Sequence, residues 1–442
     1  MARISTIPIR EVLCKVFPAA RLRALARDRG AVVRERKVDI VALFWTVVLG
    51  FGVGEQRSLA GLRRAYQRTT GQRLEESSFY DRFTPGLAKL LKAAVAEGLA
   101  AMGAQARVLR GPLAAFRDLV LADATVMRLK DLLAGVYPAC RTNHTRAAVK
   151  LHAVVSVTGT SRQGVKLTAE REHEVRVLRV GPWVRGRLLL FDLGFFRYQL
   201  FACITRNGGY FLARLKRHAN PCIVAVHRRH RGRALALVGE RLQDVLARLQ
   251  REVLDVEVEV TFPRRSYGGR VHRDRQRLRV VGLKDEASGE YHLYCTNVAS
   301  EKLAAEDVCA VYAARWQVEL LFRELKSTYR IDELPSARRP VVEALVYAAI
   351  LTFTVSRRLR EAVRGKLRHF ADRMPEQRWA RLFAAVATDL LLLMTRPPRE
   401  TRLTERLVSI LLLHEAVDPN RDRPSLIHAV ESRRHAYRPR TA

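Results

Sequence analysis

The chain has 442 residues, enough for two or three domains, and its hydrophobic content of 48% argues against wholesale disorder. It carries 79 Lys and Arg against 44 Asp and Glu, which leaves a formal net charge of +35. This excess is larger than solubility requires and predicts a polyanionic partner, with nucleic acid favoured over an anionic membrane surface.

The apolar runs and the cysteines of the sequence indicate the cellular compartment. Charged residues interrupt the start of the chain, and the longest apolar run, 341–356, contains Glu343 and is shorter than the roughly 20 residues that span a bilayer. Six scattered cysteines form no CxxC pair, and Cys140, His144 and His152 have no fourth zinc ligand nearby. We therefore expect a cytoplasmic, nucleoid-associated protein without a membrane segment or a zinc site.

Residues 1–112 are predicted to form a helical DNA-binding region. Apolar residues recur at three- and four-residue spacing over 58–99, and Pro85 stands at a predicted helix start. Short Arg-rich helices suit docking on DNA, although an ordinary helical bundle explains the pattern equally well. Gly111-Pro112 marks the end of this region.

Short apolar runs separated by polar turns come next and predict strands, at 116–123, 149–157, 164–169, 186–192 and 210–216. A helix is predicted over 195–209, ending at a Gly-Gly pair. Strands alternating with a helix indicate an α/β layer. We take 113–335 as one catalytic domain.

Within that domain, 217–300 is predicted to be a β-rich insertion. Strict alternation over 255–262 and the turn residues Tyr267-Gly268-Gly269 predict a β-hairpin. Arg-rich runs at 227–233 and 264–279 predict either a nucleic-acid contact or a solvated basic surface. Helices are predicted over 304–329 and near 341–360, and 336–442 is expected to be a helical C-terminal region with a basic tail.

Two aspartates share one context, since Asp123 and Asp192 each end a predicted buried strand. In α/β sheets the carboxyl ends of the strands form the edge where ligands bind. Taken singly, an Asp after a strand is more often a turn or helix cap. Because there are two such strand ends, a shared ligand site is as plausible as two separate turn or helix caps.

The predicted helix over 304–329 adds a third acid. Tyr312, Arg315, Glu319 and Lys326 follow one another at spacings of 3, 4 and 7 residues and occupy a stripe about 60° wide. Next to this stripe lies an apolar face that would dock on the sheet, formed by Val311, Val318, Leu321, Phe322 and Leu325. The Glu319 carboxylate is therefore expected at the border of the packed face, directed toward the two strand ends.

The motif Tyr312-x2-Arg315-x3-Glu319-x6-Lys326 resembles the signature of the insertion sequence four family of bacterial DDE transposases. Further segments follow in the family's order over about 115–330, namely LADATV, KLHAVVSVTG, LFDLGFF, FLARLK, YCTNV and YAARWQVELLFRELKS. The resemblance implies an α/β fold with a ribonuclease H-like mixed-sheet catalytic core, a β-rich insertion and helical flanking regions. One departure is Leu193 after the second aspartate, where the family usually has Arg, and it weakens any role for that residue.

The resemblance also implies which residues do the chemistry. Asp123, Asp192 and Glu319 would be catalytic and would hold two Mg²⁺ ions, with Mn²⁺ tolerated. Three carboxylates supply the oxygen ligands that hard cations prefer, and two such ions can activate the attacking oxygen and stabilise the leaving oxygen. The resemblance further implies side chains that hold DNA phosphates, namely Tyr312, Arg315 and Lys326.

Four aromatic side chains are candidates for contact with bases. Trp316 follows the motif arginine and can stack on a base, with a core position as the alternative. In relatives, an aromatic residue of the insertion stacks on or replaces a base flipped from the duplex. Tyr291, His292 and Tyr294 are the candidates for that position.

The expected function is a DNA transposase that binds the terminal inverted repeats of an insertion sequence, cleaves its ends and joins them to target DNA. Synapsis of two ends of double-stranded DNA implies at least a dimer. One alternative is a ribonuclease H-like nuclease without strand transfer. Another is a catalytically inactive, domesticated DNA-binding protein, although such a binder gains nothing from three acids that repel phosphate.

Overall fold

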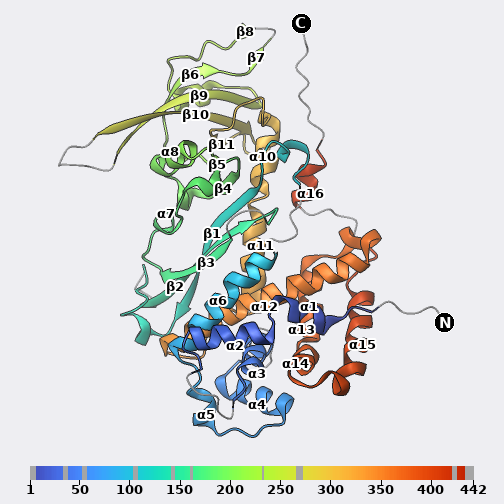
Figure 1. Ribbon diagram of the computed structural model, residues 1–442. Coiled ribbons are helices and arrows are strands. Elements are labelled where there is room, and N and C mark those ends of the chain that lie inside the picture. Colours follow the sequence, from blue (N-terminus) through green and yellow to red (C-terminus); the bar gives the residue numbers. More distant parts are fainter. Residues whose placement is uncertain are drawn as a thin grey trace.

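The computed structural model describes residues 6–32, 38–51, 57–102, 108–140, 145–159, 163–230, 233–264, 272–420 and 426–433. His144, the turn Tyr267-Gly268-Gly269 and most of the basic tail lie outside these residues. Helices from both ends of the chain gather at one end of the molecule, and a β-rich part forms the other (Figure 1). A long sheet runs between the two.

The main sheet has nine strands in the order β3-β2-β1-β4-β5-β11-β10-β9-β6. Their bounds are β1 Leu119–Leu129, β2 Ala147–Ser156, β3 Gly164–Ala169, β4 Leu188–Phe191, β5 Tyr210–Arg214, β6 Cys222–Val226, β9 Val253–Pro263, β10 Arg273–Lys284 and β11 Tyr291–Thr296. Neighbours β1, β4 and β5 are parallel and the other pairs are antiparallel. Two short strands, β7 Arg229–His230 and β8 Arg233–Ala234, pair separately. The mixed sheet expected from the sequence is confirmed.

Helices flank this sheet in sequence and in space. The first group is α1 Ile9–Val16, α2 Ala19–Asp28, α3 Ile40–Trp45 with its π-helical continuation Thr46–Phe51, α4 Leu59–Thr70, α5 Glu76–Tyr80 and α6 Pro85–Met102. Between and after the strands lie α7 Glu174–Val177, α8 Tyr198–Arg206, α9 Leu242–Arg248, α10 Ala305–Ala313 and α11 Trp316–Ser327. The last group is α12 Arg339–Lys366, α13 Glu376–Ala385, α14 Ala387–Thr395, α15 Pro398–Glu415 and α16 Leu426–Glu431.

The first group and α12 to α15 pack together into one helical body (Figure 1). Its centre is α12, which packs on α6 and matches the buried helix predicted near 341–360. In the part of the chain that the structure describes, α12 is the helix long and apolar enough to cross a membrane, but 83% of its apolar window is buried inside the protein. Its apolar composition is therefore that of a core helix.

Two hydrophobic cores lie on the two faces of the sheet. Because side chains alternate along a strand, Leu119 and Leu121 of β1 enter the first core, shared with the helical body, while Val120 enters the second core, shared with α8. Strand β4 is buried along its whole length because both of its faces are covered. This explains its unbroken apolar sequence.

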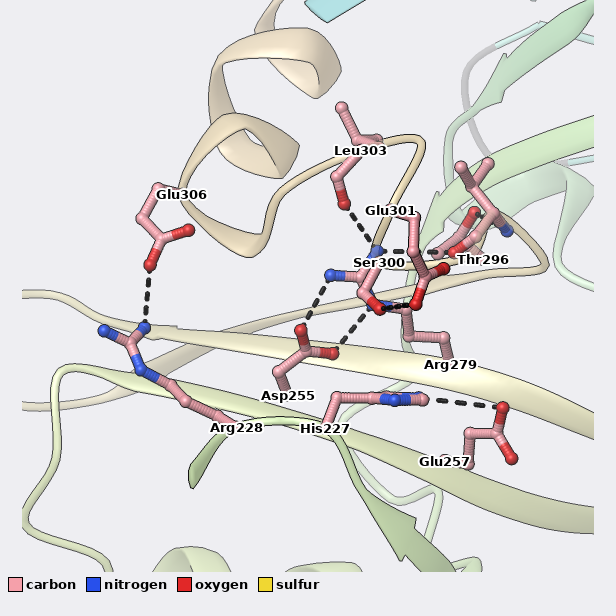
Figure 2. Close-up of polar contacts among 11 residues, drawn as sticks. His227, Arg228, Asp255, Glu257, Arg279, Thr296, Ser300, Glu301, Leu303 and Glu306 are labelled. Carbon is pink, nitrogen blue, oxygen red and sulfur yellow. Dashed lines mark hydrogen bonds and ion pairs between the residues drawn. The ribbon is translucent and has the colours of Figure 1, made fainter. Parts of the chain in front are cut away.

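The predicted β-rich insertion continues the catalytic sheet. Its hairpin β9–β10 joins through β11 to β5, so the added strands extend one edge of the sheet. Figure 2 shows how the insertion is tied to the segment before α10. Asp255 of β9 accepts two hydrogen bonds of 2.7 Å from Arg279 of β10, and Arg279 Nη1 donates to the carbonyl of Leu303 at 2.7 Å. At the rim of this contact, Arg228 Nη1 lies 2.9 Å from Glu306 Oε1.

The buried pair of Asp255 and Arg279 gives a stability prediction. Replacing Arg279 with Leu leaves the Asp255 carboxylate buried without its counter-ion, so the free energy of unfolding should fall by about 3–5 kcal/mol. Chemical denaturation measures the change. Arg217→Leu is the matched control because the Arg217 side chain is 82% exposed, and it should change the free energy by less than about 0.5 kcal/mol. Equal effects of the two variants would contradict the role given to the pair.

Candidate active site

The register of two parallel strands brings two aspartates together. Leu119–Ala122 of β1 pairs with Leu188–Phe191 of β4, and the next residue in each case is an aspartate. The aliphatic side chains two positions before each aspartate lie in the first core. By alternation Asp123 and Asp192 therefore point to the face of the sheet that α11 covers.

The position of Asp123 differs from the prediction. The sequence predicts a strand that ends at this residue, whereas β1 continues to Leu129, with Asp123 opposite Ala153 of β2. The strand is longer because β2 pairs with it beyond the point where β4 ends. Asp192 does follow the last residue of its strand, and a short 3₁₀ turn, Leu193–Phe195, comes next.

The helix over 304–329 is also interrupted, since α10 ends at Ala313 and α11 begins at Trp316. The break is closed by i→i+3 bonds, with Arg315 N donating to the carbonyl of Tyr312 at 3.0 Å. Tyr312 is buried in the last turn of α10, and its hydroxyl donates to the carbonyl of Phe191, the residue before the second aspartate, at 3.2 Å. The buried apolar side chains of α11 enter the first core, and they are Val318, Phe322 and Leu325.

One guanidinium links the acids of the strand and the helix. Arg315 Nη1 lies 2.6 Å from Glu319 Oε1 and 3.8 Å from Asp123 Oδ2, and the Arg315 side chain is only 9% exposed. Burial lowers the pKa of Arg315, but Tyr312, Glu319 and Asp192 together hold it above its ordinary value. Two of the three predicted carboxylates, those of Asp123 and Glu319, therefore contact one buried cation, and Asp192 acts on its pKa.

The electrostatics of Asp123 agree with this arrangement. The pKa of Asp123 is raised to about 6, mainly by burial, and the negative charges of Asp192 and Glu174 contribute to this rise. The backbone N–H of Ala124, which donates to Asp123 at 2.7 Å, and the guanidinium of Arg315 lower it. A nearby cation stabilises the ionised form of a carboxylate in such a place.

This donor set suits a divalent cation. Among the described residues, no group of three or more His, Cys, Asp or Glu side chains is close enough to hold a metal ion. The Arg315 guanidinium instead lies between Asp123 and Glu319, and it stands in for the positive charge that an ion would bring. Carboxylate oxygens are the ligands that Mg²⁺ and Mn²⁺ prefer, so the residues fit such a site.

The other motif residues line the same region. Lys326 Nζ donates at 3.0 Å to the carbonyl of Val126, three residues beyond Asp123 on β1. Trp316 is 54% exposed, so the alternative of a core position is wrong. Its ring lies 5.8 Å from the guanidinium carbon of Arg315, which leaves an aromatic surface open to solvent beside the acids.

The three candidates in the insertion lie in β11, and Tyr294 among them is buried with its ring against Tyr312. Tyr291 donates its hydroxyl to the carbonyls of Leu249, at 3.2 Å, and Arg251, so its ring is held against the loop after α9. His292 is exposed, with Nε2 3.6 Å from Asp285 Oδ2. Because β11 is antiparallel to β5, both residues lie toward the sheet edge where β4 ends. Their contact with a base stays a prediction.

A fourth acid near the site was missed from the sequence. Glu174, the first residue of α7, lies 3.6 Å from the amino group of Lys150 and adds to the negative charge at Asp123. The Glu174 carboxylate lies so close to Gly194, in the turn after Asp192, that a Cβ at this position would displace it. The glycine in the Asp192 box was the available signal, but nothing in the pattern around 174 indicated its partner.

Comparison with known proteins identifies the family. Residues 114–354 match the family described as a transposase DDE domain, which is more than half of the chain. The chain belongs to this family of DDE transposases, whose domains generally depend on divalent metal ions. The sheet order and the helical flanks are those of its ribonuclease H-like core with a β-rich insertion.

Curated relatives agree with this family. The transposase for insertion sequence element IS231F of Bacillus thuringiensis subsp. israelensis is 20% identical over 267 residues, covering 53% of this chain and 55% of the relative. The putative transposase InsL for insertion sequence element IS186A of Escherichia coli K12 is 31% identical over 78 residues, covering 18% of this chain and 21% of the relative. The chain thus spans about half or less of the length of these relatives. The narrower resemblance to the insertion sequence four family fits them.

The raised pKa of Asp123 predicts a pH-dependent effect. A folded-state pKa above the unfolded value means that ionised Asp123 costs stability, and that this cost is absent below about pH 4 and complete above about pH 6. Asp123→Asn should therefore raise the melting temperature of the metal-free protein at pH 8 and leave it unchanged near pH 4. Asp332→Asn, at an exposed position, is the control and should change neither. A gain that is equal at both pH values would contradict this assignment.

Proposed function

We propose that this chain is a DNA transposase that binds the terminal inverted repeats of an insertion sequence, cleaves its ends and joins them to target DNA. The observation that carries the proposal is the contact of the buried Arg315 guanidinium with both Asp123 and Glu319, beside the strand pair that places Asp192 next to Asp123. Two aspartates on neighbouring parallel strands and a glutamate on the covering helix supply the oxygen ligands of a two-metal site. We infer that these three carboxylates hold two Mg²⁺ ions, with Mn²⁺ tolerated.

Bound divalent ions would supply an activated attacking oxygen and a stabilised leaving oxygen. The protein's own groups hold the DNA strand in position. Arg315 offers the planar fork that binds two phosphate oxygens, and Lys326 adds a compact charge next to β1. Tyr312 fixes the end of α10 against β4, and the exposed ring of Trp316 is placed to stack on a base.

The proposed partners follow from charge and chemistry. A net charge of +35 suits long double-stranded DNA, both the element's ends and the target. Joining two ends in one reaction calls for a dimer in a synaptic complex. We propose 1–112 as a DNA-binding region, 113–335 as the catalytic domain and 336–442 as a supporting helical region, in a cytoplasmic protein associated with the nucleoid.

Substitution of the carboxylates tests the proposal. Asp123→Asn, Asp192→Asn and Glu319→Gln should each reduce Mg²⁺-dependent cleavage of a terminal-repeat duplex to the background without enzyme, while duplex binding is retained. The measurement is a gel assay of cleavage and strand transfer with the wild-type chain and each variant. Cleavage by the wild type without joining would instead indicate a nuclease, and absence of both reactions would indicate an inactive DNA-binding protein.

The control for Glu319 needs an exposed acid. Glu324 points away from the site, as helix periodicity predicts, but it is buried and lies 2.6 Å from Arg357, so its loss would disturb the fold. Asp332→Asn removes one exposed carboxylate just beyond α11 and should leave cleavage unchanged. Full activity of Glu319→Gln would exclude the proposed two-metal site.

The contact of Arg315 with two carboxylates gives a separate prediction. Because the guanidinium competes with a metal ion for Asp123 and Glu319, Arg315→Gln should raise the affinity for Mn²⁺ in the absence of DNA by about tenfold. Titration with the paramagnetic ion, followed by the signal of free Mn²⁺, measures this. Arg217→Gln removes the same charge from an exposed position and should have no effect. Unchanged or weaker binding by Arg315→Gln would show that the guanidinium does not occupy the ion's place.

A further inference from the structure

A row of arginines follows one face of β10. Arg273, Arg275 and Arg277 alternate along the strand and all are exposed. Between them, Asp274 and Gln276 point to the opposite face, where the amide of Gln276 donates to the hydroxyl of Thr205 at 3.2 Å. The three arginines therefore share one face because side chains alternate between the two faces of a strand.

The next arginine of the same row lies inside the protein and has a structural role. Arg279, the next member, is buried and fully engaged by Asp255 and by carbonyl groups (Figure 2). Along the exposed part, Arg275 lies 3.7 Å from Glu259 and its side chain is still 75% exposed. Among the described residues, Arg273 and Arg277 have no acidic partner within ion-pair distance. In the part of the chain that the structure describes, the ion pairs of this row therefore compensate only part of its positive charge.

The position of the row fits an extended partner. Through β11 and β5, strand β10 runs in the same direction as β1, so the row lies toward the end of the sheet opposite to the carboxylates. The row lies on the same face of the sheet as the first core, since Val281, farther along the row, belongs to that core. The hairpin β9–β10 projects from the body of the molecule (Figure 1). A partner that touches both the row and the carboxylates must therefore be long.

We propose that Arg273, Arg275 and Arg277 bind the phosphate backbone of duplex DNA outside the stretch that enters the carboxylate site. The proposal rests on the proposed function. Alternate residues of a strand repeat about every 7 Å, so each guanidinium can reach a different phosphate of one DNA strand. Arginine forks suit phosphate oxygens, and contacts of this kind fix the position of the protein on a duplex without reading its sequence.

The test is the salt dependence of binding to a duplex of about 40 base pairs without divalent ions. A triple variant, R273Q/R275Q/R277Q, should bind more weakly and lose about 2–3 from the slope of log affinity against log salt, since each phosphate contact contributes about 0.9. The matched control is R399Q/R402Q/R406Q on α15, which removes the same charge from three other exposed positions. Its slope should stay within about 0.5 of the wild type.

An equal loss of slope in the two triple variants would overturn the proposal, because net charge alone would then explain the effect. An unchanged slope in R273Q/R275Q/R277Q would also overturn it and would point to a protein partner for the row. Both triple variants should keep the melting-temperature shift that Mn²⁺ causes in the wild type. Failure of the carboxylate variants to abolish cleavage would refute the proposed function, whereas loss of the slope effect alone would refute only this DNA surface.

Discussion

The site depends on one constraint, the compensation of negative charge in a largely buried place. Asp123 lies on a strand between two cores, and its burial is the main reason why its pKa rises. Like charges at Asp192 and Glu174 add to the cost of ionisation, and without a cation such a cluster would repel itself and any phosphate. Arg315 supplies that cation, since it contacts both Asp123 and Glu319. Asp123 and Glu319 can therefore lie close to the same place without a bound ion or DNA.

Convergence itself follows from strand register. In a parallel pair, residues at the same level point to the same face, so an aspartate after each of two matched four-residue segments gives two carboxylates side by side. The covering helix must then bring its acid to the same level. The hydrogen bond from Tyr312 to the carbonyl of Phe191 fixes α10 at the end of β4 and so sets the start of α11. Glu319 is one turn farther along.

Much of this was predictable from local pattern. Apolar runs of strand length, the position of Asp192 after one of them and the spacing around Glu319 are sequence features. They indicated the α/β class and, together with the family resemblance, the three candidate acids. The continuation of β1 past Asp123 was not predictable in the same way, because it depends on pairing with β2. The break at Ala314 interrupts a stretch that reads as one helix, and Glu174 reaches the site only through tertiary folding. A local sequence pattern does not show contacts between residues that are far apart in the sequence.

Helix α11 is also held from the side away from the acids. Glu324 on that side is paired with Arg357 of α12, at 2.6 Å. At the end of α11, the guanidinium of Arg57, from the region before α4, donates to the carbonyls of Tyr329, at 3.1 Å, and Arg330, at 2.6 Å. Since α12 in turn packs on α6, both ends of the chain contribute to the position of α11. A helix fixed on its far side by a buried ion pair, and at its end by hydrogen bonds from Arg57, can present a polar row to the sheet without turning away. The place of Glu319 therefore depends on the whole helical body as well as on the motif that contains it.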